Sequence, residues 1–72
     1  MDKKAVEHLL QEMIDLQQAK VLSSARRILP HLTTDDILQP NDFPELENHP
    51  HFRYDEGVLE GLKSVQMAIR VL

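Results

Sequence analysis

Residues 3–29, KKAVEHLLQEMIDLQQAKVLSSARRIL, decide the fold of this chain. The stretch contains neither Gly nor Pro, and its apolar residues recur at steps of three and four positions, as they do along one side of a helix. Asp2 is placed to cap the amino end of such a helix. Arg26 and Arg27 suit its carbonyl end, and Pro30 disfavours its continuation. The sequence therefore predicts a long helix over residues 3–29.

A second helix is predicted over residues 55–72. Asp55 and Glu56 suit the positive end of its dipole. Gly57 and Gly61 would let another backbone approach closely, although each costs up to about 1 kcal/mol relative to Ala. The apolar residues of the segment form one continuous stripe, made of Val58, Leu59, Leu62, Val65, Ala68, Ile69 and Leu72. We expect an all-α antiparallel hairpin that forms a single domain over residues 1–72.

The connector over residues 30–54 has a different composition, with prolines at positions 30, 40, 44 and 50 and many Asp, Asn and Thr residues. We expect it to hold one or two short helical turns. Thr33 or Thr34 is suited to cap the first turn, which would end at Leu38, and Asp42 is suited to cap the second.

Unequal helix lengths point to self-association. At 1.5 Å per residue the first helix would be about 40 Å long and the last about 26 Å. If Asp55 starts beside Leu29, Leu72 reaches only to about the level of Gln11 or Glu12. We therefore expect a homodimer that buries the uncovered end of the first helix, with an interface made of Val6, Leu9, Leu10 and Met13. The alternative is a monomer with a bent or frayed first helix.

Residues 42–56 contain every aromatic residue of the chain and five acidic residues around them. One interpretation is a satellite core in which Phe43, Phe52 and Tyr54 close the end of the hairpin. The other is a recognition surface for a basic or amphipathic protein segment. That surface would consist of Phe43, Glu45, Glu47, Phe52, Tyr54 and Asp55.

A site for a metal ion or a small ligand is the alternative from a different functional class. His49 and His51 flank Pro50 and have carboxylates nearby in the sequence, and these donor types bind zinc and other divalent ions. A His-x-His pair in a connector defines no helical face, so the spacing is weak evidence. The competing interpretation is two exposed histidines.

Composition excludes several other classes. The chain has no Cys, which rules out disulfides and thiolate zinc sites, and no run of about 18 to 20 apolar residues that would indicate a membrane span. Its net charge of −4, with only Lys20, Arg26 and Arg27 as a small positive group, argues against a nucleic-acid partner. No nucleophile with an evident base is present. We expect a cytoplasmic, non-enzymatic interaction module without a cofactor, which binds a protein partner through its acidic aromatic connector or through an exposed helix face.

Overall fold

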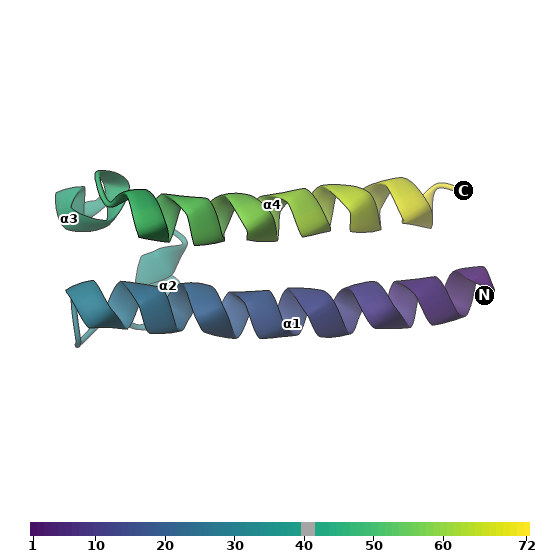
Figure 1. Ribbon diagram of the computed structural model, residues 1–72, viewed down its shortest axis with the longest axis horizontal. Coiled ribbons are helices and arrows are strands. Elements are labelled where there is room, and N and C mark those ends of the chain that lie inside the picture. Colours follow the sequence, from purple (N-terminus) through teal and green to yellow (C-terminus); the bar gives the residue numbers. More distant parts are fainter. Residues whose placement is uncertain (40–41) are drawn as a thin grey trace.

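The structure is a computed structural model that describes residues 1–39 and 42–72. Within these ranges it has four helices, α1 (Lys3–Ile28), α2 (Thr34–Ile37), α3 (Pro44–Glu47) and α4 (Pro50–Arg70). Helices α1 and α4 lie side by side and run in opposite directions, with both termini at one end (Figure 1). We call that end the open end and the end that carries the connector the closed end. The predicted all-α antiparallel hairpin is confirmed.

Helix α1 forms as the sequence predicts. The Ala5 backbone N–H donates to Asp2 Oδ1 over 2.8 Å, which caps the amino end, and Arg26 and Arg27 lie in the last turn. The helix ends at Ile28, because Leu29 adopts an extended conformation before Pro30.

Helix α4 begins at Pro50, so the prediction that it starts near Asp55 was wrong. His49 is its N-cap residue, and the Phe52 backbone N–H donates to His49 Nδ1 over 3.4 Å. A proline is well tolerated at the first helical position, because its missing N–H would have no partner there. Asp55 therefore lies inside the helix and does not face the positive end of its dipole.

The connector holds two short helices, as predicted. Thr33 caps α2 through a capping box, in which the Thr33 backbone N–H donates to Asp36 Oδ2 over 2.9 Å. The cap predicted at Asp42 was wrong, since the N-cap residue of α3 is Phe43 and no side chain caps this helix. Pro44 begins α3 by the same rule that places Pro50 at the start of α4.

The alignment of α4 on α1 removes the overhang that the sequence predicted. Gln66 Nε2 donates to Gln11 Oε1 over 2.8 Å, and Lys3 Nζ donates to the main-chain oxygen of Leu72 over 2.9 Å. Leu72 thus reaches the level of Lys3 and not only that of Gln11. The expectation failed because α4 begins more than one turn earlier than predicted.

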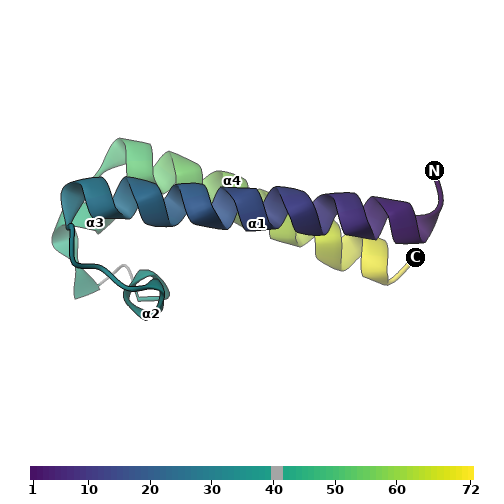
Figure 2. The ribbon, with the colours of Figure 1, turned by 90° about the horizontal axis from the view of Figure 1, so that it is seen from below.

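The core lies mainly in the closed half of the molecule, where α1, α4 and the connector meet. Leu46 and Phe52 have no exposed surface. Helix α2 covers only one side of the α1–α4 pair, as Figures 1 and 2 show together. The buried apolar cluster consists of Ile14, Val21, Ala25, Leu32, Leu46, Phe52 and Leu59.

The molecule is long and thin, with principal extents of 41 × 19 × 16 Å and a radius of gyration of 13.8 Å. A compact domain of this length has a radius of gyration of about 11 Å. The accessible surface is 5209 Å², whereas a compact monomer of this mass exposes about 4,600 Å². In residues 1–39 and 42–72, no helix is both long and apolar enough to pass through a bilayer.

Candidate functional site

An apolar stripe runs along α1 outside its contact with α4. Leu9, Met13 and Leu16 follow one another at steps of four and three residues, so they lie on one side of the helix. Their exposed fractions are 46%, 42% and 74%. Lys20 continues the same stripe, and its Nζ lies 3.9 Å from Asp55 Oδ1 on α4. This side of α1 therefore adjoins the side of α4 on which Asp55 lies.

A matching stripe runs along α4. Val58 and Val65 lie three and ten positions after Asp55, which places them next to the buried Asp55 on one flank of the helix, and both are exposed. Gly61 lies between them in the sequence, and a Cβ atom built on it would meet nothing within 4 Å. The two stripes thus form one surface, which we call the lateral face. It consists of Leu9, Met13, Leu16, Val58, Gly61 and Val65.

Helix α2 covers the opposite side of the hairpin. A pocket on that side is lined by Leu22 of α1, by Ile37 of α2 and by Leu59 and Lys63 of α4. In Figure 2, α2 and α3 both lie at the closed end, and in the described part of the chain no connector helix runs along the middle or the open part of the α1–α4 pair.

The residues predicted to form a dimer interface do not all reach the lateral face. Leu9 and Met13 are exposed on it, and Val6 is half-buried. Leu10 is 8% exposed and packs inside the hairpin, because α4 extends to the open end. Sequence reasoning missed Leu16 and Val65 as face residues. Their signal was present as a second apolar stripe on each helix, beside the one that forms the hairpin.

A buried polar cluster lies beneath the closed end of the lateral face. Ser24 Oγ donates to Asp55 Oδ2 over 2.6 Å, and these residues are 7% and 1% exposed. Gln17 Nε2 donates to the main-chain oxygen of Asp55 over 2.9 Å. The evident role of this cluster is to align α1 with α4.

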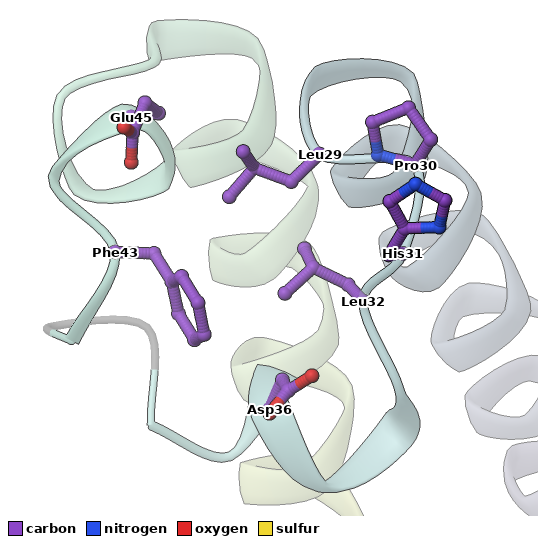
Figure 3. A pocket seen from close by; sticks show the side chains of 7 residues that line it. All are labelled: Leu29, Pro30, His31, Leu32, Asp36, Phe43 and Glu45. Carbon is purple, nitrogen blue, oxygen red and sulfur yellow. The ribbon is translucent and has the colours of Figure 1, made fainter.

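A second candidate surface is a depression at the closed end, which we call the closed-end pocket. Its volume is about 300 Å³. Leu29, Leu32 and Phe43 point toward one another across it, and Asp36 and Glu45 lie at its edges (Figure 3). Its lining residues are Leu29, Pro30, His31, Leu32, Asp36, Phe43 and Glu45.

The six predicted partner-binding residues separate into two groups. Phe43 and Glu45 line the closed-end pocket, while Phe52 and Asp55 are buried between the helices and present no surface to a partner. Glu47 and Tyr54 are exposed but do not line the pocket. The interpretation as a satellite core fits Phe52 and the half-buried Phe43, which packs against the core, but not Tyr54, which is 69% exposed.

His49 and His51 lie on the side of the closed end that adjoins Ser24. Both line a small pocket together with Ser24 and the cationic Arg27. In residues 1–39 and 42–72, no three His, Cys, Asp or Glu side chains converge as metal ligands. His49 Nδ1 also accepts the hydrogen bond that caps α4, which competes with its use as a ligand.

Comparison with known proteins gives no further guidance, because no protein-family model, curated protein or solved structure matches this chain.

Proposed function

We propose that this chain is a non-enzymatic helical interaction module that forms a homodimer through the lateral face and uses its closed end to hold a protein partner. The observation that carries the proposal is the lateral face itself. It joins exposed apolar side chains from α1 and α4 on the side that no connector helix covers.

The exposed area supports burial of this face by another molecule. The chain exposes about 600 Å² more than a compact monomer of its mass, and one partner in a standard interface buries about 800 Å². Complete burial of a Leu, Val or Met side chain contributes about 1.5 to 3 kcal/mol. A domain of 72 residues has a net stability of only about 4 to 11 kcal/mol, so covering several such side chains is a large gain.

The spacing of apolar residues favours a second copy as the partner on this face. Each long helix has two adjacent stripes at steps of three and four residues, one turned to the other helix and one on the lateral face. Helices with two such stripes are typical of four-helix bundles, and two hairpins packed face to face supply four helices. A twofold dimer is also the commonest form of self-association.

The distribution of charge is compatible with this pairing. The acidic residues Asp35 and Asp36 belong to α2, on the side of the hairpin away from the lateral face. In a dimer joined by the lateral faces, Asp35 and Asp36 of one copy would therefore point away from those of the other copy. This keeps the repulsion between like charges small, because exposed charges more than about 10 Å apart are largely screened at moderate salt.

Light scattering over a range of protein concentrations tests the dimer. The natural sequence is expected to give twice the mass of the 8.3 kDa chain at concentrations of about 100 µM. Leu16→Glu should yield a monomer, because it places a charge at the centre of the apolar face. Leu38→Glu is the matched control, since Leu38 is 76% exposed but lies on the connector.

Circular dichroism of both variants would establish that they remain helical. A natural chain that stays monomeric at about 500 µM, or equal behaviour of the Leu16 and Leu38 variants, would contradict the proposed dimer.

A further inference from the structure

We propose that the closed-end pocket binds an apolar side chain of a partner protein, on a segment that carries Lys or Arg on both sides of that anchor. The inference is based on the arrangement of the pocket, in which an apolar floor lies between two carboxylates. Leu29, Leu32 and Phe43 form the floor, and Asp36 and Glu45 come from two different short helices at its edges. The inference rests on the proposed function only in taking the ligand to be a protein.

The apolar part of the pocket sets the size of the anchor. Its volume of about 300 Å³ is at the lower limit of sites that enclose a complete small molecule, which hold about 300 to 1,000 Å³. The depression is open and shallow, so it covers one side of its occupant. A bulky aliphatic or aromatic side chain held by its own backbone fits this shape better than a free ligand does.

The charges around the pocket set the chemistry of the flanking residues. Residues 30–49 contain five acidic residues and neither Lys nor Arg. Asp36 Oδ2 accepts the Thr33 backbone N–H in the capping box, so this carboxylate is fixed in position. In the described part of the chain, neither Asp36 nor Glu45 forms a salt bridge. Both carboxylates are therefore free to attract cations of a partner.

One cation of the protein lies close to the pocket. Arg26 Nε donates to the main-chain oxygen of Leu32 over 2.9 Å, which holds its guanidinium group near the α1 edge. His31 also lines the pocket on that side. The cations of the partner segment should therefore lie over the Asp36 and Glu45 edges and avoid the edge formed by the end of α1.

The lateral face and the closed-end pocket share no residue. The face is built from α1 and α4, whereas the pocket is built from residues 29–32, α2, Phe43 and α3. Binding at the pocket and dimerisation can therefore be measured and disrupted separately.

A short model peptide is the probe for this inference. The peptide acetyl-Lys-Lys-Leu-Leu-Lys-Lys-amide would be titrated into the ¹⁵N-labelled full chain, and its counterpart with Glu in place of Lys would be titrated as the control. The Lys peptide is expected to shift the backbone resonances of Leu32, Phe43 and Glu45, and to bind more weakly as salt rises. The Glu peptide should cause no such shifts.

Two charge-reversal variants then locate the binding site. Glu45→Lys should weaken binding of the Lys peptide about tenfold or more, since it replaces an attractive edge of the pocket with a repulsive one. Glu47→Lys makes the same change of charge in the same short helix but outside the pocket lining, so its effect should be about threefold or less.

Three results would overturn the inference. These are no binding of the Lys peptide at about 1 mM, equal binding of the Glu peptide, or equal weakening by the Glu45 and Glu47 variants. Light scattering on the Glu45 variant distinguishes failure of peptide binding from failure of the proposed dimer. Its mass should equal that of the natural chain whether or not the peptide binds.

Discussion

In the closed half of the hairpin, α1 and α4 pack against each other and against the connector, and Leu46 and Phe52 become completely buried. In the open half the two helices have only each other. No residue after Leu59 is buried, although α4 continues to Arg70. The difference teaches that stability is concentrated at the closed end. Apolar surface that lacks an internal partner is left along the middle and open parts of the molecule, where the lateral face lies.

Truncation of one core side chain in each half tests this contrast most strongly. Phe52→Ala should lower the free energy of unfolding by about 3 to 5 kcal/mol, because it leaves a large cavity at the centre of the closed half. Ile69→Ala removes a half-buried side chain in the open half and should cost about 1 kcal/mol. Urea denaturation followed by circular dichroism measures both losses. Similar losses would mean that the two halves do not differ as described.

The buried Ser24–Asp55 hydrogen bond offers the next largest effect. Ser24→Ala should destabilise the chain by about 1 to 3 kcal/mol, since it leaves a buried carboxylate without its hydroxyl donor. Ser64→Ala is the matched control. The Ser64 hydroxyl donates to the Glu60 main-chain oxygen on the exposed surface of α4, so its removal should change stability by about 0.5 kcal/mol or less. A Ser24 variant no less stable than the Ser64 variant would contradict a structural role for the pair.

Replacement of the two glycines of α4 should stabilise the helix. Gly57→Ala and Gly61→Ala each should raise the free energy of unfolding by up to about 1 kcal/mol, because both sites are open and Ala is the better helix former. Thermal unfolding at a protein concentration at which light scattering gives the mass of a monomer measures this gain. A loss of stability at either site would show that something packs against that glycine in the monomer.

The smallest effect is expected at the open end itself. Lys3→Ala removes the contacts of Lys3 Nζ with the main-chain oxygens of Arg70 and Leu72, which are exposed to solvent. The global stability should change by about 0.5 kcal/mol or less. Amide hydrogen exchange in the last turn of α4 should nevertheless become faster, because that turn opens locally. Destabilisation comparable to that of the Ser24 variant would mean that the open end contributes to global stability, which would contradict the difference between the two halves.

The long helices could be predicted from the sequence because their signal is local. The regular spacing of apolar residues and the lack of Gly and Pro gave α1 within one residue at its carboxyl end. The start of α4 was missed because Pro50 was taken to belong to the connector. A proline is also a favoured first residue of a helix, so Pro50 was itself the available signal.

The alignment of the two helices could not be predicted in the same way. It depends on Ser24 and Asp55, two polar residues that apolar periodicity assigns to the solvent. Nothing local marks them as partners, since they are 31 residues apart and meet only when the hairpin closes. Two residues of the predicted partner surface, Phe43 and Glu45, line the closed-end pocket, but the pocket itself was not predicted. Its other lining residues join them only through the path of the folded connector.

The Ser24–Asp55 pair also guards against slippage. Heptad-like stripes look alike after a shift of one helical turn, so apolar contacts alone would tolerate α4 sliding along α1. Such a shift would bring the Asp55 carboxylate opposite Val21 or Ile28, where no hydroxyl is available. Leaving a buried carboxylate without its hydrogen-bond donor lowers the stability of the fold by several kcal/mol. A misaligned hairpin would lose this buried contact together with the Gln17–Asp55 and Gln66–Gln11 hydrogen bonds. These polar contacts let an otherwise repetitive pair of helices choose one alignment.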